Sequence, residues 1–170
     1  MVGLDALLES RDRRSFRQKD LLAAYPGCGL VCLTVIFPGQ VKRSKESLIV
    51  GGAAVAAILG RFSRQIKYSE VRDLETGYEA YFMVEAPAVE LKRICCEIEE
   101  THPLGRLMDI DVLGADAVPL DRRFFGFSPR KCLVCGRDAR LCIREASHDI
   151  NELDNIIKQM IDAYVSGTYI

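Results

Sequence analysis

The order of apolar segments between residues 30 and 113 limits the folds open to this sequence more than any other feature. Short runs rich in β-branched residues, typical of strands, alternate with longer stretches whose apolar residues recur at helical spacing. This strand, helix, strand, strand, helix, strand order predicts an α+β fold with a ferredoxin-like βαββαβ core, in which two helices cover one face of an antiparallel sheet. The predicted elements are Leu30–Phe37, Ser44–Phe62, Ile66–Leu74, Glu79–Glu85, Ala88–Thr101 and Leu107–Leu113.

Segments on either side extend this core to 170 residues. That length suits a single domain, because domains average about 100–200 residues. The turn signal Pro26-Gly27 separates a first helix from the core, and a cysteine-rich stretch separates the core from a last helix. We expect an N-terminal helix at 1–25, the α+β core at 30–126, a Cys/His-rich segment at 128–148 and a C-terminal helix at 150–165.

The two core helices carry apolar residues at helical spacing, which predicts the side that each turns to the sheet. In the second of them, the adjacent residues Cys95 and Cys96 are not both expected to face the core, because neighbours on a helix point in different directions. In the first, the residues expected on the core-facing stripe are Leu48, Val55, Leu59 and Phe62.

Charge and cysteine content exclude several classes of protein. The 23 basic and 24 acidic residues give a net charge of -1, so no global field attracts nucleic acid or an anionic membrane, and any anion site must be local. The most apolar stretch, Leu48–Leu59, is shorter than the roughly 20 residues of a membrane span. Seven cysteines, an odd number, and no signal-peptide pattern predict reduced thiols and a cytoplasmic location.

Two acidic residues stand out in the last predicted strand. Alternation along a strand places Asp109 and Asp111 on one face. Like charges held close together are costly unless a cation lies between them, and Mg²⁺ binds phosphate substrates through one or two carboxylates. The pair therefore predicts a metal and phosphate site, with Arg106 nearby to hold phosphate. The alternative is a solvated strand face with no function.

Two basic segments are candidates for binding phosphate. In the first helix Arg11, Arg14, Arg17 and Gln18 recur three or four residues apart along one face. Lys42 and Arg43 precede the helix that begins near Ser44, where free N–H groups and the helix dipole favour an anion. In both cases the alternative is a solvated surface.

A Cys/His pattern and a single histidine complete the candidate sites. Cys132, Cys135, Cys142 and His148 offer four ligands for a tetrahedral Zn²⁺, of which the Cys-x2-Cys pair is the specific part. Four protein ligands leave no open position, so such a zinc would be structural; the alternative is a set of reduced thiols. His102 is a candidate general base, with a helix C-terminal histidine as the alternative.

These segments together resemble the citrate lyase holo-acyl-carrier-protein synthase family, the apo-citrate lyase phosphoribosyl-dephospho-CoA transferases. The likeness spans nearly the whole chain in order. Where that family's turn reads Pro-Gly-Pro, this chain has Gln40 in the third position. The residues that carry the resemblance are Leu7 to Asp12, Arg14, Arg17, Gln18, Leu33 to Val35, Pro38, Gly39, Lys42, His102 to Leu113, Arg130 to Cys135, Cys142 and His148.

The resemblance implies a nucleotidyltransferase. Its donor would be 2'-(5''-triphosphoribosyl)-3'-dephospho-CoA, its acceptor a serine of the citrate lyase acyl-carrier subunit, and diphosphate would be released. Asp109 and Asp111 would then hold Mg²⁺ and His102 would be the base. The implied phosphate ligands are Arg11, Arg14, Arg17, Lys42 and Arg106.

Other functions remain open at this stage. The Cys/His segment alone would also suit a zinc-stabilised binding module, although near-neutral charge disfavours nucleic acid as its partner. A non-catalytic assembly factor for citrate lyase would keep the family without turnover. The acceptor could also be the carrier subunit of malonate decarboxylase, which takes the same prosthetic group.

Overall fold

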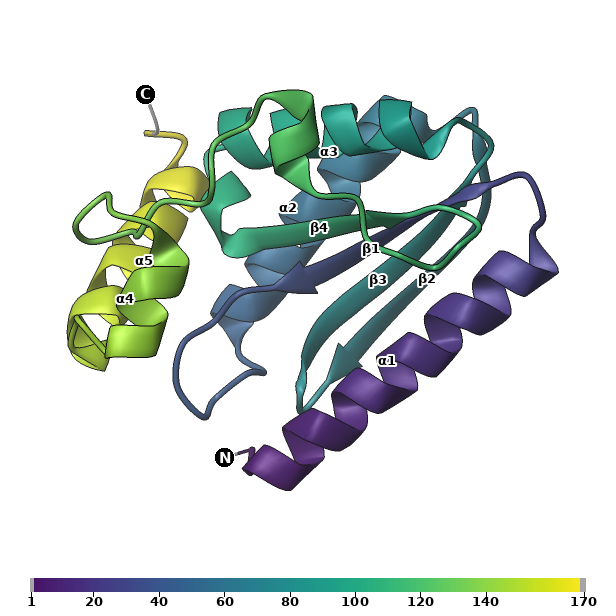
Figure 1. The fold of residues 1–170 in the computed structure, drawn as a ribbon. Helices are drawn as coiled ribbons and strands as arrows, with labels where there is room; N and C mark the ends of the chain where they lie inside the picture. Colours follow the sequence, from purple (N-terminus) through teal and green to yellow (C-terminus); the bar gives the residue numbers. More distant parts are fainter. Residues whose placement is uncertain (1, 169–170) are drawn as a thin grey trace.

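The computed structural model describes residues 2–168, and within them a four-stranded antiparallel sheet lies between helices on both faces (Figure 1). The predicted order of strands and helices is confirmed. The elements are α1 (Leu4–Ala24), β1 (Gly29–Val35), α2 (Lys45–Phe62), β2 (Ile66–Leu74), β3 (Gly77–Val84), α3 (Ala88–Thr101), β4 (Met108–Leu113), α4 (Ala139–Glu145) and α5 (Ile150–Ser166), with short 3-10 turns η1 (Gly105–Leu107) and η2 (Arg122–Phe125).

The strands lie in the order β2-β3-β1-β4, and each neighbouring pair is antiparallel. β1 is therefore central, with Leu33 opposite Ala80 of β3 on one side and opposite Ile110 of β4 on the other. β4 is an edge strand. Its outer backbone groups need partners from outside the sheet, and this shapes the candidate site.

The back face of the sheet, which we define as the face covered by α2 and α3, holds the main hydrophobic core (Figure 1). α5 adds Ile157 and Ile161 to this core, as its helical apolar stripe predicts. The sheet contributes alternate residues of β1, β3 and β4, and none of the following is more than 8% exposed: Val31, Leu33, Tyr78, Ala80, Phe82, Val84, Met108, Ile110 and Val112.

The front face is covered by α1 (Figure 1). Leu21 packs there against a small apolar cluster that includes Tyr81 and Met83. The remainder of α1 meets the sheet through polar side chains, beginning with the buried Ser10. Among the described residues, no helix combines the length and apolar character that crossing a membrane requires.

The predicted core-facing stripe of α2 is wrong in part. Phe62 is buried, but Leu48 and Leu59 are 43% and 40% exposed. The helix instead turns its smaller residues to the sheet, because a Cβ added at Gly51 would lie 2.6 Å from the ring of Tyr78. Close approach to that ring fixes the rotation of the helix. The buried residues of α2 are Ser47, Val50, Gly51, Ala53, Ala54, Ile58 and Phe62.

The adjacent cysteines of α3 do not both face the back-face core, as expected, although Cys95 and Cys96 are both fully buried. Cys95 belongs to the back-face core, whereas Cys96 lies on a second buried side of the helix. The turn η2 contacts α3, so a segment distant in sequence helps to cover this helix. β1 ends at Val35, two residues before the predicted Phe37.

Candidate active site

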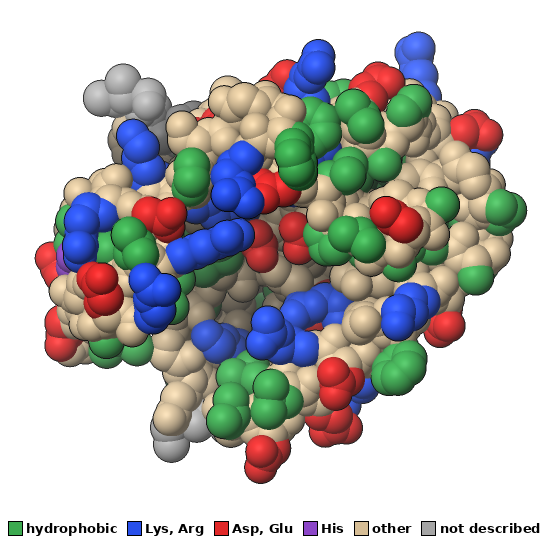
Figure 2. All heavy atoms as spheres, in the orientation of Figure 1, with side chains coloured by type: hydrophobic (Ala, Val, Ile, Leu, Met, Phe, Trp, Pro, Cys, Tyr) green, Lys and Arg blue, Asp and Glu red, His purple; other side chains and the backbone are tan. Residues whose placement is uncertain are grey.

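The carboxylates of Asp109 and Asp111 lie on the front face of β4, as predicted. Across the sheet, Asp111 is paired with Cys32 and Asp109 with Thr34 of β1. The two side chains are 43% and 48% exposed, so both reach solvent. Figure 2 shows a hollow in this side of the molecule, with acidic side chains at its rim and basic side chains on both sides of it.

Two buried charged residues of α3 position this strand. The N–H of Ile110, the residue between the aspartates, donates to the carboxylate of Glu99 at 2.7 Å. The ammonium of Lys92 donates to the Ile110 carbonyl at 3.0 Å. Glu99 and Lys92 therefore satisfy both outer backbone groups of an edge-strand residue, which fixes the direction of the neighbouring aspartates.

The electrostatics at the aspartates are only partly balanced. Asp109 lies 3.1 Å from Arg130 Nη2, whereas Asp111 is 3.9 Å from the ammonium of Lys92. Partial burial, and then the negative charge of Asp109, raise the pKa of Asp111 above its ordinary value of 3.8. A cation placed between the two carboxylates would relieve that repulsion.

The basic face of α1 divides into two groups. Arg14 faces the sheet, with its guanidinium 3.4 Å from the buried carboxylate of Glu79. Gln18, one turn further along, donates to the sulfur of Cys32 at 3.4 Å. These two side chains lie on the side of α1 that faces the central strand. Arg11 is exposed and forms no ion pair with any described residue.

Arg17 lies on the other side of α1 and is engaged with β2. Its Nε donates to Glu70 at 2.9 Å and its Nη2 to the Tyr68 hydroxyl at 2.7 Å. This partnership supports a role in holding α1 against the sheet. Arg17 therefore has different partners from Arg14 and Arg11, although all three share one stripe in the sequence.

The loop before α2 differs from the free phosphate pocket that the sequence suggested. The Ser44 hydroxyl accepts the N–H of Ser47 at 3.2 Å, so a capping box occupies part of the helix N-terminus. Arg43 pairs with Asp73 and Glu75 at 2.9 and 2.8 Å. Lys42 donates to the carbonyl of Phe37, and burial lowers its pKa.

His102 lies at the C-terminal end of α3 and packs against Tyr164 of α5, with ring centroids 5.4 Å apart. Its Nδ1 accepts the N–H of Leu104 at 3.0 Å, and burial lowers its pKa. These contacts order the turn that leads into β4. A base role would require the ring to take up a proton, although one of its nitrogens already accepts this bond.

Arg106 lies on the turn η1, half-buried, with no ion-pair or hydrogen-bond partner among the described residues. The turn itself depends on Gly105, because a Cβ there would lie 2.3 Å from the Glu99 carbonyl oxygen. Arg106 therefore remains a cation without a protein anion, close to the start of β4.

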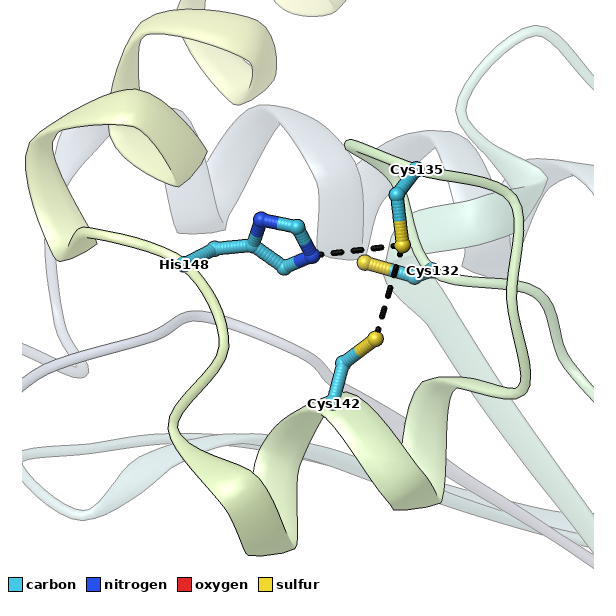
Figure 3. A group of neighbouring side chains, drawn as sticks. All are labelled: Cys132, Cys135, Cys142 and His148. Atoms are coloured by element: carbon cyan, nitrogen blue, oxygen red, sulfur yellow. Dashed lines mark hydrogen bonds between the residues drawn. The ribbon is translucent and has the colours of Figure 1, made fainter.

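The four predicted zinc ligands converge in the structure (Figure 3). Their ligand atoms all lie within 4.8 Å of one another. Cys135 Sγ is 3.5 Å from Cys142 Sγ and 3.3 Å from His148 Nε2. In a tetrahedral site with Zn–S bonds of about 2.3 Å the sulfurs stand roughly 3.8 Å apart. The cluster therefore has the size and donors of a zinc site.

Local sequence explains this convergence. Gly136, with φ +71°, allows the tight turn after Cys135, and its N–H donates to the Cys132 carbonyl at 3.2 Å. Asp138 caps α4, the helix that presents Cys142. Hydrogen bonds from the backbone and side chain of Arg137 lower the pKa of Cys135 to about 6, which favours the thiolate that metals bind.

Sequence reasoning missed several charged residues around the aspartates. Lys92 and Glu99 follow the apolar positions of α3 by one residue, so they resemble a solvent face, yet each is less than 5% exposed. Arg122 and Arg130 come from the segment after β4 and reach Glu99 at the edge of the sheet. For Lys92 and Glu99, the signal in the sequence was two opposite charges seven residues apart on the same helix.

Comparisons with known proteins identify relatives along most of the sequence. The model of a family described as apo-citrate lyase phosphoribosyl-dephospho-CoA transferase matches residues 2–164. A protein of Shigella boydii serotype 18 with that same name is 35% identical over 164 residues, which cover 95% of this chain and 89% of that protein. Protein CitXG of Haemophilus influenzae is 37% identical over 163 residues, but the match covers only 35% of its length.

Proposed function

The chain belongs to the apo-citrate lyase phosphoribosyl-dephospho-CoA transferase family, and from that premise we propose that it loads the citrate lyase acyl-carrier subunit with its prosthetic group. The donor is 2'-(5''-triphosphoribosyl)-3'-dephospho-CoA, and a serine of the carrier is the acceptor. The observation that carries the proposal is a family match over residues 2–164, which include both front-face aspartates.

The reaction joins the serine oxygen to the phosphorus next to the ribose and releases diphosphate. Such a displacement depends on neutralising phosphate charge and on aligning the nucleophile. The front face offers both kinds of group, because cations of α1 stand opposite the carboxylates of β4. We assign phosphate binding to Arg11, Arg14, Lys42 and Arg106, whereas Arg17 holds α1 through Glu70.

We propose that Asp109 and Asp111 hold Mg²⁺. Two carboxylates that share one strand face and reach solvent fit the ion, which takes protein carboxylates together with substrate phosphates. The raised pKa of Asp111 reflects the repulsion that such an ion would remove. When bound, Mg²⁺ would supply charge neutralisation at the phosphates.

His102 remains our proposal for the general base, with a specific test. His102→Asn places an amide oxygen near the position of Nδ1, so it keeps an acceptor for the Leu104 N–H, but it cannot take a proton from the serine hydroxyl. A fall in the transfer rate with a normal fold would support the base role. An unchanged transfer rate would mean that His102 only orders the turn before β4.

We propose a structural zinc at Cys132, Cys135, Cys142 and His148. The four donors and their spacing support it. The segment that this zinc would order also carries Arg130, which bridges to Asp109.

For the α+β core, we propose the ferredoxin-like arrangement, and the strand order β2-β3-β1-β4 supports it.

The first experiment measures the intact mass of apo acyl-carrier subunit after incubation with this protein and the donor. Because EDTA removes both metals, the protein is stripped and then supplied with Mg²⁺ alone, Zn²⁺ alone or both. A mass gain equal to phosphoribosyl-dephospho-CoA that requires Mg²⁺ supports the transferase and its metal.

The alternatives give different results in the same assay. No mass gain with a competent carrier and donor would favour a binding module or a non-catalytic assembly factor. A gain that does not depend on added Mg²⁺ would overturn the magnesium assignment and leave the transferase in place. Replacing the carrier with that of malonate decarboxylase tests the choice of partner.

A further inference from the structure

A cavity of about 300 Å³ lies next to the front-face aspartates, and the proposed function does not account for its full lining. Its walls come from α3, from η1 and from the segment between η2 and Cys132. Two carboxylates and four cations line it. The charged residues are Glu99, Glu100, Arg106, Arg122, Arg130 and Lys131.

The two carboxylates of this cavity only partly neutralise its four cations. Arg122 pairs with both Glu99 and Glu100, and Arg130 pairs with Glu99. Arg106 has no partner among the described residues, and burial, with the charges of Arg130 and Arg122, lowers its pKa. Arg122 is only 12% exposed, and its Nε is the one buried side-chain nitrogen or oxygen without a hydrogen-bond partner in the described chain. Buried donors without acceptors are rare and costly, so their presence points to a ligand.

The position of the cavity indicates which part of a ligand it receives. Arg130 bonds to Glu99 in the cavity wall and lies 3.1 Å from Asp109. One guanidinium therefore joins the cavity to the carboxylate pair. A group bound in the cavity would therefore lie close to a phosphate held at the aspartates.

We propose that this cavity binds the terminal diphosphate of the donor's triphosphate chain, the part that leaves in the reaction. This inference rests on the proposed function. As the serine oxygen bonds to the phosphorus nearest the ribose, the bond from that phosphorus to the bridging oxygen breaks, its electron pair stays on the diphosphate, and the hydroxyl proton passes to the base. Arg106, Arg122, Arg130 and Lys131 stabilise the charge that grows on the leaving diphosphate.

The donor contains a second diphosphate, inside its dephospho-CoA portion, and size and charge separate the two. The internal diphosphate carries an organic group at each end, whereas the terminal diphosphate is bare at one end and more highly charged. Whole-ligand sites span about 300–1,000 Å³, so a cavity at the lower limit suits a small anion better than dephospho-CoA.

Calorimetric titration of the full chain with inorganic diphosphate tests the proposal. Arg106→Gln and Arg122→Gln are each expected to weaken binding by about tenfold or more, the loss typical of one charge-assisted contact. The matched control is Arg123→Gln, because Arg123 neighbours Arg122 but is 65% exposed and pairs only with Asp121. Its affinity for diphosphate should equal that of the unchanged protein.

Thermal unfolding of Arg106→Gln guards against a trivial loss of fold. Because Arg106 has no partner and lies near other cations, its removal should leave the midpoint unchanged or raise it. Weaker diphosphate binding together with an undiminished midpoint supports the proposal. Diphosphate binding in Arg106→Gln and Arg122→Gln as tight as in the unchanged protein would overturn it.

Two further arms separate the possible failures. Titration with dephospho-CoA should be insensitive to Arg106→Gln; a selective loss there would assign the cavity to the internal diphosphate and overturn our assignment. The carrier mass assay is run in parallel. Normal transfer to the carrier without diphosphate binding in the cavity would overturn this inference and leave the proposed function in place. Diphosphate binding in the cavity without transfer would support the diphosphate site and refute the proposed function.

Discussion

The two faces of the sheet are covered by different kinds of contact. On the back face α2, α3 and α5 bury apolar side chains against the strands. On the front face, apart from the apolar cluster around Leu21, α1 is held by polar groups: Ser10 lies 2.9 Å from the hydroxyl of Thr76 in the β2–β3 turn, and Arg17 bonds to Glu70. The front face also carries Asp109 and Asp111, which no helix covers completely.

Because of this difference, the back face of the sheet mainly stabilises the fold, whereas the front face carries the candidate functional groups. Burial of apolar area is non-directional and supplies most of the folding free energy, so the back face can define the fold. Polar contacts are directional and contribute little net free energy, but they fix orientation. The front face therefore holds α1 in place without closing the hollow over β1 and β4.

The largest expected effect tests the back face. Phe62→Ala should lower the free energy of unfolding by about 3–5 kcal/mol, because a fully buried aromatic ring leaves a cavity. Leu59→Ala, on the same helix but 40% exposed, is the control and should cost less than about 1 kcal/mol. Chemical denaturation measures both. Equal losses would mean that the rotation of α2 described above is incorrect.

The next effect concerns the front face and appears in activity. Asp111→Asn should lower the rate of carrier loading by about 100-fold or more, because a metal ligand contributes several kcal/mol to charge stabilisation. Its thermal midpoint should stay level or rise, since repulsion from Asp109 is removed. Asp20→Asn, an exposed change on α1, should be neutral in both assays. A stability loss in Asp111→Asn would assign this residue to the fold instead.

A third prediction links the zinc cluster to the front face. Cys135→Ser should abolish stoichiometric zinc, measured by mass spectrometry of the metal, and lower the loading rate by about tenfold through the segment that carries Arg130. Cys28→Ser, a free cysteine outside the cluster, is the control. Unchanged zinc content would contradict the ligand set. Unchanged activity after zinc loss would separate the cluster from catalysis.

Local pattern was sufficient to predict the helices and strands of the α+β core and both flanking helices, but it missed the short helix α4 inside the Cys/His-rich segment. The bounds of β2 and α3 agree with the sequence interpretation, because turn residues and apolar spacing are local. The rotation of α2 was not predictable in this way. It depends on Gly51 approaching the Tyr78 ring, a contact between an α-helix and a strand that only the assembled structure defines.

The candidate site was predictable in its aspartates and cysteines and not in their surroundings. Asp109 and Asp111 share a face through simple alternation, and the zinc ligands follow from spacing. The partners of Glu99 could not be found, because Arg122 and Arg130 reach it from a segment more than twenty residues away.

The smallest expected effect tests how little the front-face polar contacts contribute to stability. Burial alone would raise the pKa of Glu70, but hydrogen bonds from Arg17, Arg72 and Tyr68 outweigh it and lower the pKa below the ordinary 4.5. A depressed carboxyl pKa stabilises the fold above pH 4.5 and loses that contribution as pH falls through the folded-state value. Glu70→Gln should therefore cost about 1 kcal/mol or less near neutral pH, and the difference from the unchanged protein should vanish in acid.

Denaturation curves at several pH values measure that difference, with Glu75→Gln as the control because Glu75 is 78% exposed and pairs with Arg43 at the surface. A cost for Glu70→Gln comparable to that of Phe62→Ala would end the contrast between the faces, since the front face would then stabilise the fold as strongly as the back. A small, pH-dependent cost would sharpen it, because α1 would then be oriented by contacts that add little to stability. Their role would then be to orient α1, whose Arg14 lies close enough to Asp111 to influence the pKa of that carboxyl.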